Sequence, residues 1–437
     1  MQTHFSLAQL ANANIAEANS ILRNCVHCGF CTATCPTYVI LGSELDSPRG
    51  RIYMIKDYLE NDRPADKHFA THIDRCLSCL SCMSTCPSGV NYMHLVDHAR
   101  VHLETTYRRP FMDRTLRYVL AMVMPYPARF RAALRLASLG RPFAGIFEKF
   151  SPLKPVAAML RLAPAKIWSD TPHTLPGVFS PSNSVVKKGR IALLNNCVQP
   201  VLDAEVNSAT ISLLNRLGVE VVLPKGEACC GSLAHHMGRE KQALEQVRHM
   251  VDIWHEEIET AGLDAILVTA SGCGTTIKDY GFMLRNDKTY AEKAAKISAL
   301  ALDITEYLGQ LDLPAISAPM SGSVAYHSAC SLQHGQQIKS GPKELLRKAG
   351  LTVHEPAEPH LCCGSAGTYN IMHVETATLL RDRKIKNIDQ TGAEIIVAGN
   401  VGCITHLAMG TDRPVLHIVK LLNWAYGGGK PSELDNQ

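Results

Sequence analysis

Two spacing patterns, each present twice, account for all 16 cysteines of this 437-residue chain. In the first pattern, three cysteines at three-residue spacing are followed by a fourth cysteine and a proline. Its two copies are Cys25, Cys28, Cys31, Cys35 and Pro36, and Cys76, Cys79, Cys82, Cys86 and Pro87. In the second pattern, a single cysteine precedes a Cys-Cys-Gly triplet and another single cysteine follows it. Its copies comprise Cys197, Cys229, Cys230 and Cys273, and Cys330, Cys362, Cys363 and Cys403. The chain must therefore fold around repeated cysteine clusters.

The length of the chain predicts about three domains of about 150 residues each, enough to bury stable cores without disulfide bonds. The first residues lack the basic start, the apolar run and the cleavage site of a secretory signal. We therefore expect the chain in a reducing cytoplasm, where clustered cysteines serve as metal ligands or redox groups.

The first pattern has the spacing of ferredoxins that carry two 4Fe-4S clusters. In such ferredoxins the fourth cysteine of each run, which precedes the proline, ligates the other cluster. The expected ligand sets are Cys25, Cys28, Cys31 and Cys86 for one cluster, and Cys76, Cys79, Cys82 and Cys35 for the second. Zinc is the alternative, because Cys-x2-Cys pairs also form tetrahedral zinc sites. Two complete runs that each close on Cys-Pro favour the iron–sulfur interpretation.

Each copy of the second pattern is predicted to be a small α/β unit. Residues 190–197 and 323–330 are predicted strands that end on a cysteine. A helix, a strand before the double cysteine, another helix and a strand before the last cysteine follow in both copies. This order predicts parallel sheets, whose ligands gather outside the carboxyl ends of the strands. The four cysteines of each copy are therefore expected to meet at one rim.

The predicted fold class is α/β with an N-terminal α-helical ferredoxin-like domain. The expected domains are a domain for two 4Fe-4S clusters (1–104), a basic helical segment with a linker (105–185), and duplicated Cys-Cys-Gly domains (186–315 and 316–437). Within them, a helix is predicted from Leu7 to Arg23 and a linker from Pro172 to Ser184.

The role of the Cys-Cys-Gly cysteines has three interpretations. Adjacent thiolates can bind neighbouring iron atoms of a cluster, can form a redox dithiol, or can pack as buried apolar side chains. Duplication of the whole neighbourhood favours a cluster or redox site in at least one copy. His406, three residues after Cys403, is either a further ligand or locally hydrogen-bonded. For His327, His360 and His27, which also flank cysteines, local roles are expected.

The stretch from Thr105 to Trp168 is basic, although the net charge of the chain is only +4. It contains twelve Arg and Lys residues against Asp113 and Glu148; they are Arg108, Arg109, Arg114, Arg117, Arg129, Arg131, Arg135, Arg141, Lys149, Lys154, Arg161 and Lys166. A solvated helical layer explains this charge, and an anionic membrane surface or an acidic partner is the alternative. No nucleic-acid-binding motif accompanies the charge, so we expect no nucleic acid partner.

Two classes of segment are absent from the sequence. No window approaches the roughly 20 apolar residues of a membrane span. No glycine-rich dinucleotide fingerprint and no phosphate-binding loop is present either. Electrons are therefore expected to come from a partner that binds its own cofactor.

Six runs closely resemble the iron–sulfur subunit family of bacterial glycolate oxidase. They are CVHCGFCTATCPTY, DSPRGRIYMIK, RCLSCLSCMSTCPSGV, TASGCGTTIKDYG, HLCCGSAGTYNIMH and NVGCITHLA. More broadly, the chain is similar to proteins that pair a ferredoxin domain with Cys-Cys-Gly domains. This wider family includes the iron–sulfur subunits of anaerobic glycerol-3-phosphate dehydrogenase, of lactate-utilisation complexes and of heterodisulfide reductases.

The resemblance implies an electron-transfer subunit that works with FAD-binding glycolate oxidase subunits, which oxidise glycolate to glyoxylate, and that delivers electrons to a quinone. It implies two 4Fe-4S clusters on the eight ferredoxin-type cysteines and leaves open a further iron–sulfur cluster in a Cys-Cys-Gly domain. The implied location is the cytoplasm, with peripheral attachment to the inner membrane. In heterodisulfide reductases each Cys-Cys-Gly domain ends in Cys-x2-Cys, whereas here Thr276 and His406 replace the last cysteine. A five-cysteine cluster is therefore not implied.

Three alternatives to this function stay open. The substrate of the complex could be lactate or glycerol 3-phosphate, because this chain is not expected to touch it. The Cys-Cys-Gly repeat could itself be a thiol site, as in a heterodisulfide reductase. A metal-bound scaffold without a redox role predicts zinc in place of iron.

Overall fold

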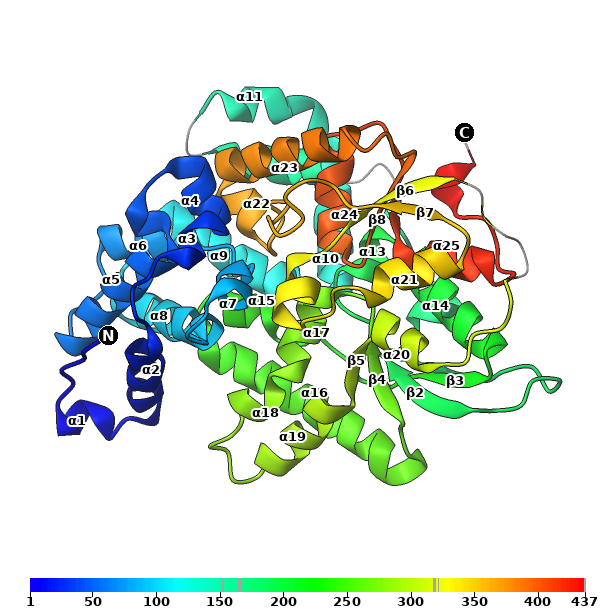
Figure 1. Ribbon diagram of the computed structural model, residues 1–437, viewed down its shortest axis with the longest axis horizontal. Coiled ribbons are helices and arrows are strands. Elements are labelled where there is room, and N and C mark those ends of the chain that lie inside the picture. Colours follow the sequence, from blue (N-terminus) through cyan, green and yellow to red (C-terminus); the bar gives the residue numbers. More distant parts are fainter. Residues whose placement is uncertain (151–152, 164–166, 317–319, 321, 436–437) are drawn as a thin grey trace.

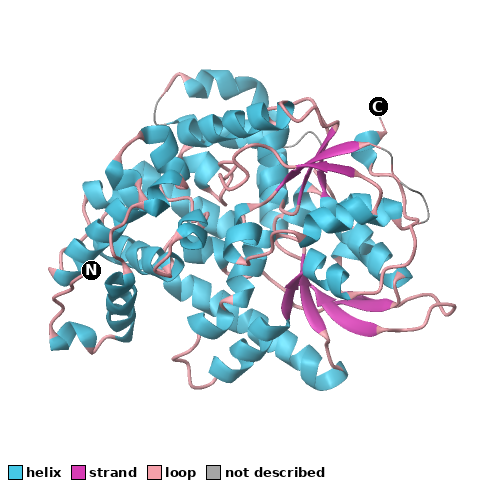
Figure 2. Cartoon of the chain, in the orientation of Figure 1, coloured by secondary structure: helices cyan, strands magenta, loops and turns pink. Residues whose placement is uncertain are grey.

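The computed structural model describes residues 1–150, 153–163, 167–316, 320 and 322–435. An entirely helical N-terminal part lies on one side, and two small sheets surrounded by helices lie on the other (Figures 1 and 2). Of the basic residues named above, Lys166 lies outside the described residues. The helical and α/β regions follow one another in the predicted order.

Short helices separated by the cysteine loops form the N-terminal part. They are α1 (Leu7–Leu10), α2 (Ala13–Asn24), α3 (Phe30–Ala33), α4 (Pro36–Leu41), α5 (Pro48–Glu60), α6 (Lys67–Asp74), α7 (Ser81–Thr85) and α8 (Tyr92–Thr106). The single helix predicted from Leu7 to Arg23 is wrong, because it is divided at Asn12. The Asn12 side chain accepts a hydrogen bond from the Asn14 backbone and starts α2 as its N-cap.

Residues 107–150 and 153–163 form a helical layer. Its helices are α9 (Phe111–Val123), α10 (Pro127–Gly140), α11 (Ala144–Glu148) and α12 (Lys154–Leu162). Three of its arginines are buried rather than solvated. Arg109 and Arg117 both form ion pairs with Asp74 of α6, at 2.6 and 2.9 Å, and Arg131 pairs with Asp170 at 2.7 Å. Among the described residues, no helix combines the length and the apolar character needed to cross a membrane.

The first sheet has the order β1-β3-β2-β4-β5. Its strands are β1 (Gly177–Phe179), β2 (Gly189–Leu193), β3 (Val219–Leu223), β4 (Ala265–Val268) and β5 (Ala301–Asp303). Its helices are α13 (Gln199–Leu202), α14 (Glu205–Arg216), α15 (Ser232–His236), α16 (Glu240–Ala261), α17 (Ser271–Lys278), α18 (Tyr280–Met283), α19 (Ala291–Leu300) and α20 (Ile304–Gln310). β2 to β5 pair in parallel, as predicted, and β4 is buried throughout, as expected for a strand covered on both faces.

Two local features of this sheet differ from the sequence expectation. The predicted linker contains β1, which pairs antiparallel with β3 at the edge of the sheet. The predicted strand 190–197 is shorter, because β2 ends at Leu193. After it, the Asn196 side chain accepts hydrogen bonds from the Val198 and Gln199 backbones and turns the chain into α13.

The second sheet has the order β7-β6-β8-β9 and is parallel throughout. Its strands are β6 (Ser323–His327), β7 (Thr352–His354), β8 (Ile395–Ala398) and β9 (Val415–His417). Its helices are α21 (Gly341–Lys348), α22 (Tyr369–Met372), α23 (Val374–Asp389), α24 (Val401–Ala408) and α25 (Ile418–Ala425), and Ser331–Gly335 form a π-helical turn. β6 ends at His327, so Cys330 also follows its strand, at the start of the π-helical turn.

The two sheets share one hydrophobic core. Buried residues of both units, including Leu213 of α14 and Leu421 of α25, belong to a single apolar cluster. Near the cysteines the units also meet through the hydroxyl groups of Ser271 and Ser331, 2.7 Å apart. The duplicated units are therefore packed face to face, and this packing brings their cysteine rims close together.

Candidate functional site

Five ferredoxin-type cysteines line one small cavity near the surface: Cys82, which a neighbouring cavity shares, and the four of the expected set, Cys25, Cys28, Cys31 and Cys86. Of these four, three come from the first run and the fourth comes from the second run, as in the crossed assignment. Cys25 follows α2 as its C-cap, and Cys31 lies within α3. Cys28 is exposed, whereas Cys25 is buried.

A second cavity is lined by Cys35, Cys76, Cys79 and Cys82. Cys35 is the N-cap of α4, and Pro36 occupies the first position of that helix, where its missing N–H costs no hydrogen bond. Cys82 borders both cavities, so the two lie side by side. The structure therefore brings together both predicted sets of four cysteines.

Matched left-handed residues shape the two cysteine loops. His27 and Gly29 of the first run have φ values of 56° and 84°, and Ser78 and Leu80 of the second run have 49° and 61°. Residues other than glycine rarely adopt this conformation, and it costs about 1–3 kcal/mol where it occurs. Both loops adopt this uncommon shape at the same offsets, so the spacing of the cysteines reflects one repeated backbone path.

Arg51 is a buried cation beside Cys35 that the sequence analysis did not assign to the site. Its Nε donates to the His72 carbonyl at 2.7 Å, and its Nη2 donates to Thr37 Oγ1 at 3.1 Å. Its Nη1 lies 3.9 Å from Cys35 Sγ, and buried Asp46 balances its charge at 3.5 Å. A sequence signal for it was the run DSPRGRIYMIK between the two cysteine runs, which contains Arg51.

The thiol chemistry of these cavities fits iron–sulfur clusters. Burial raises the pKa of the Cys31 thiol to about 11 and raises the pKa values of Cys79 and Cys82 well above their ordinary value. Buried thiols of this kind ionise when a cationic centre compensates for the lost solvation. Iron supplies that charge, and the four cysteines of each set match the ligand number of a 4Fe-4S cluster.

The first Cys-Cys-Gly site joins four cysteines at the carboxyl end of its sheet. Cys197 follows β2, Cys229 and Cys230 precede the left-handed N-cap residue Gly231 of α15, and Cys273 lies in α17. The Sγ atoms of Cys197 and Cys229 are 3.7 Å apart. Hydrogen bonds from Cys197 and Cys230 hold the pKa of Cys229 well below its ordinary value. The same bonds raise the pKa values of Cys197 and Cys230.

The second Cys-Cys-Gly site repeats this geometry. The Sγ atoms of Cys330 and Cys362 are again 3.7 Å apart, and Gly364 has a φ of 93°. A hydrogen bond also links the thiols of Cys363 and Cys403. The structure thus brings the four predicted cysteines of each copy together.

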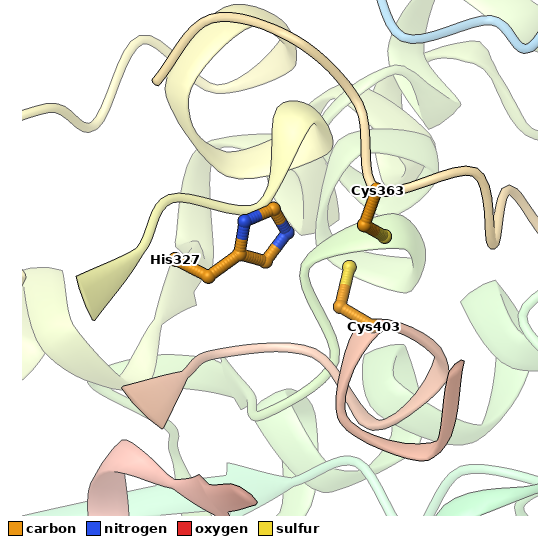
Figure 3. A group of neighbouring side chains, drawn as sticks. All are labelled: His327, Cys363 and Cys403. Atoms are coloured by element: carbon orange, nitrogen blue, oxygen red, sulfur yellow. The ribbon is translucent and has the colours of Figure 1, made fainter. Parts of the chain in front are cut away.

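His327 lies in the second site, although a local role was expected for it. It ends β6, is only 2% exposed, and one ring nitrogen is directed towards the sulfur atoms of Cys363 and Cys403 (Figure 3). The three ligand atoms lie within 4.8 Å of one another. Burial lowers the pKa of His327 to about 3, so the ring is neutral. A signal for it was its position three residues before Cys330.

The other histidines near the cysteines have local partners. His406 Nε2 donates to the Ala377 carbonyl at 3.2 Å, which matches the local alternative predicted for it. The His360 carbonyl accepts from His334 Nε2 at 3.1 Å. His27 is one of the left-handed loop residues described above.

One cavity of 260 Å³ connects the cysteine sites. Its lining includes cysteines of both Cys-Cys-Gly copies and of the second ferredoxin-type run: Cys197, Cys229, Cys230, Cys273, Cys330, Cys362, Cys403 and Cys76. On one side, Leu77, Cys79, Cys362 and Tyr369 pack in a single buried cluster. The second ferredoxin-type site therefore adjoins the second Cys-Cys-Gly site directly.

Two family models match the chain over the same regions. A 4Fe-4S dicluster domain matches residues 21–90, and a cysteine-rich domain matches residues 191–278 and 324–408. Together with the two sets of four cysteines, the dicluster match shows that the chain is an electron carrier with two 4Fe-4S clusters.

Curated relatives cover nearly the whole chain. The glycolate oxidase iron-sulfur subunit of Escherichia coli (strain K12) is 41% identical over 97% of this chain and 99% of its own length. The probable glycolate oxidase iron-sulfur subunit of Bacillus subtilis (strain 168) is 30% identical over 93% of this chain and 94% of its own length. Lactate utilization protein A of Bacillus cereus (strain G9842) is 27% identical over 54% of this chain and 98% of its own length. The sequence identity, the domain order and the cysteine sites lead to the same conclusion: the chain belongs to the glycolate oxidase iron–sulfur subunit family.

Proposed function

We propose that this chain is the electron-transfer subunit of a glycolate-oxidising complex, which takes electrons from a flavin-binding partner subunit and delivers them to a quinone. The observation that carries this proposal is the continuous row of cysteine sites. It runs from exposed Cys28, through the two adjoining ferredoxin-type cavities, to the cavity shared by both Cys-Cys-Gly sites.

Exposed apolar residues surround the outer end of this row. Val26, Phe30 and Tyr53 are each more than half exposed, and they lie beside or near Cys28. Large exposed apolar side chains that cluster at one place mark interaction surfaces. We assign this surface to the flavin-binding partner, because electrons must enter where a cysteine site reaches the outside.

The chain controls electron transfer through the surroundings of the cysteines. When bound, a 4Fe-4S cluster accepts and releases one electron at a time, with a reduction potential set by burial, hydrogen bonds to sulfur and nearby charge. Arg51 places a buried positive charge beside Cys35, and the Tyr92 hydroxyl donates to Cys76 Sγ at 3.8 Å. Both groups stabilise negative charge on the second ferredoxin-type site.

We assign attachment at the membrane to the helical layer of residues 107–150 and 153–163. Apolar side chains of α10 and the helices that follow it are strongly exposed, among them Leu136, Leu139 and Phe143. Basic residues lie in the same stretch, including Arg135 and Arg141. Exposed apolar side chains flanked by basic ones are typical of surfaces that bind anionic membranes. Quinone is dissolved in that membrane, so this face suits delivery to it.

Electron paramagnetic resonance on the anaerobically isolated native complex tests the proposal. Glycolate should produce reduced-cluster signals, with dithionite as the positive comparison. Signals that form only with lactate or only with glycerol 3-phosphate would replace the proposed substrate. An absence of signals even with dithionite would contradict the electron-carrier role itself.

Two variants separate entry of electrons from their exit. In Cys362→Ser, glycolate-dependent reduction of an artificial dye should survive while reduction of quinone falls. In Cys28→Ser, both activities should fall, because the outer ferredoxin-type site is lost. Unchanged quinone reduction in Cys362→Ser would remove the Cys-Cys-Gly half from the proposed path.

A thiol-disulfide enzyme is the second candidate, because the low pKa of Cys229 makes its thiolate available beside Cys197. Turnover of a small disulfide by the full chain, lost in Cys229→Ser, would favour this candidate.

A further inference from the structure

One buried side chain at the carboxyl end of strand β2 or β6 differs between the two Cys-Cys-Gly sites. Ile191 of β2 lies opposite the first residue of β4, and Val324 of β6 lies opposite the first residue of β8. Ile191 and Val324 therefore occupy equivalent positions in the two copies. The position that corresponds to His327 is therefore Leu194 in the first copy. Leu194 is fully buried in an apolar cluster. The first site thus offers only sulfur atoms, whereas the second also offers an imidazole nitrogen.

His327 Nε2 has the properties of an uncommitted metal ligand. It is buried, and it has no hydrogen-bond partner among the residues that the structure describes. Leaving a buried polar atom unpaired costs about 1–3 kcal/mol, so such atoms require an explanation. His406 also has an unpartnered ring nitrogen, Nδ1, but its Nε2 bonds the Ala377 carbonyl, whereas the free nitrogen of His327 is the one that lies with the two sulfur atoms.

We propose that the second Cys-Cys-Gly site binds a transition-metal ion of the zinc and iron class through His327 Nε2, Cys363 Sγ and Cys403 Sγ. The three ligand atoms already lie within 4.8 Å of one another on three separate elements, the end of β6, the loop before α22 and helix α24 (Figure 3). Thiolates with one imidazole suit both zinc and iron. Cys330 and Cys362 lie next to this group and supply further sulfur atoms.

Binding of the metal ion releases protons and requires no oxidant or reductant. A divalent ion replaces the protons of the Cys363 and Cys403 thiols, and both protons pass to solvent. The neutral His327 ring contributes its Nε2 lone pair and releases no proton. The same nitrogen ligand serves mononuclear zinc and an iron atom of a cluster. The inference rests on the residues of the second site and does not depend on glycolate as the substrate.

The full chain, purified anaerobically in its complex, allows a direct test without a variant. Metal content identifies zinc and iron, and X-ray absorption at each edge counts the nitrogen ligands. Pulsed electron paramagnetic resonance on protein made with ¹⁴N- or ¹⁵N-histidine detects a histidine bound to iron. We expect one histidine nitrogen bound to one metal. That metal is zinc if the site holds a mononuclear ion, and iron if the site holds a cluster. Absence of a histidine nitrogen from every metal would overturn the proposal.

Three variants test whether His327 supplies the nitrogen that binds the metal. His327→Leu, which copies the first site, should lose the nitrogen signal and weaken retention of this metal against a chelator by more than about tenfold, a loss typical of disturbed metal sites. His327→Cys should keep the metal without the nitrogen signal. His406→Gln is the matched control and should keep both. A nitrogen signal that persists in His327→Leu would overturn the assignment, and the ferredoxin-type cluster signals report whether each variant has folded.

Discussion

Single buried side chains distinguish cysteine sites that are otherwise built alike. Arg51 adds a positive charge beside Cys35, and His327 adds a nitrogen beside Cys363, whereas Leu194 adds neither at the first Cys-Cys-Gly site. In a buried environment such differences act strongly, because little solvent screens them. The reduction potential and metal preference of each site are therefore set by neighbours of the cysteines.

We predict that Arg51→Met lowers the reduction potential of the second ferredoxin-type site, because an added electron loses its nearby cation. The variant should also lose about 1–3 kcal/mol of unfolding free energy, since the buried His72 carbonyl loses its donor, whereas Asp46 keeps Arg75 as a partner at 2.9 Å. A redox titration followed by electron paramagnetic resonance and a urea titration check both effects. Arg63→Met is the control, because Arg63 pairs with Asp57 at the exposed surface. An unchanged potential in Arg51→Met would show that this charge does not tune the site.

We predict that Gly364→Ala destabilises the second Cys-Cys-Gly unit. The residue has a φ of 93°, and an added Cβ would lie 2.5 Å from the Ala377 carbonyl oxygen. Backbone strain alone costs about 1–3 kcal/mol, and the steric conflict adds to it. Gly392→Ala is the matched control, because Gly392 also has a positive φ but has open space around its Cβ position. Equal losses in urea titrations of the two variants would contradict the steric explanation.

At the scale of single residues, the sequence predicts which cysteines form each site better than it predicts the other side chains that surround them. The sets of four follow from spacing, because each set is dominated by residues close in the chain. Arg51 and His327 act on atoms from distant segments, such as the His72 carbonyl and Cys403. Only tertiary packing reveals those pairs.

At the scale of elements, the parallel pairing of the strands was predictable from the alternation of strands and helices, but the ends of the elements were not. Asn12 divides the first helix, and Asn196 ends the strand before Cys197, each through a short-range side-chain bond to the backbone. β1 escaped prediction because a three-residue edge strand has too little pattern to detect. Caps and turns therefore account for most differences.

Helix α8 contacts helix α15 through an ion pair that holds the ferredoxin-type region against the first Cys-Cys-Gly unit. His235 Nε2 of α15 lies 3.0 Å from Asp97 Oδ2 of α8. Burial lowers the pKa of His235, but the charge and hydrogen bond of Asp97 outweigh burial and raise it above its ordinary value of 6.5. His236, Arg100 and Asp279 also face this pair.

We predict that this contact stabilises the chain at low pH and weakens as pH rises. Because the folded pKa of His235 is raised, its contribution is complete below pH 6.5 and is lost as pH passes the raised value. Thermal unfolding of the wild type should therefore lose stability on the alkaline side, and His235→Gln should reduce that slope. His4→Gln, at an exposed site, is the control. A slope that is unchanged in His235→Gln would exclude His235 as its source.

At the scale of the whole molecule, duplication and packing produce an arrangement that neither copy has alone. The shared core turns the two cysteine rims towards one cavity, and the ferredoxin-type region closes another side of it through Leu77 and Ser78. The sequence predicts that each copy gathers its cysteines at one edge of its sheet. It does not predict that the two edges lie close together, because contacts between the duplicated units leave no periodic pattern in the sequence. The shared cavity is therefore a property of the assembled chain.

We predict that the full chain binds vesicles that contain anionic lipid and that salt weakens this binding. Leu139→Asp should reduce the bound fraction several-fold, since Leu139 is 75% exposed on the layer assigned to the membrane. Leu379→Asp is the matched control, because Leu379 is a 53% exposed leucine on α23. Equal losses in both variants, measured by co-sedimentation, would remove the membrane role from this layer.

Each cysteine run contributes its last cysteine, Cys35 or Cys86, to the cavity of the other run, and this arrangement has a consequence for biosynthesis. The inner set is complete only after synthesis has passed Cys82, and the outer set only after it has passed Cys86, so the first run must remain open while the second is being made. Truncated chains that end before Cys86 should therefore hold no stable cluster in the outer cavity. The crossed cysteines make cofactor insertion an event that follows synthesis of the whole N-terminal region.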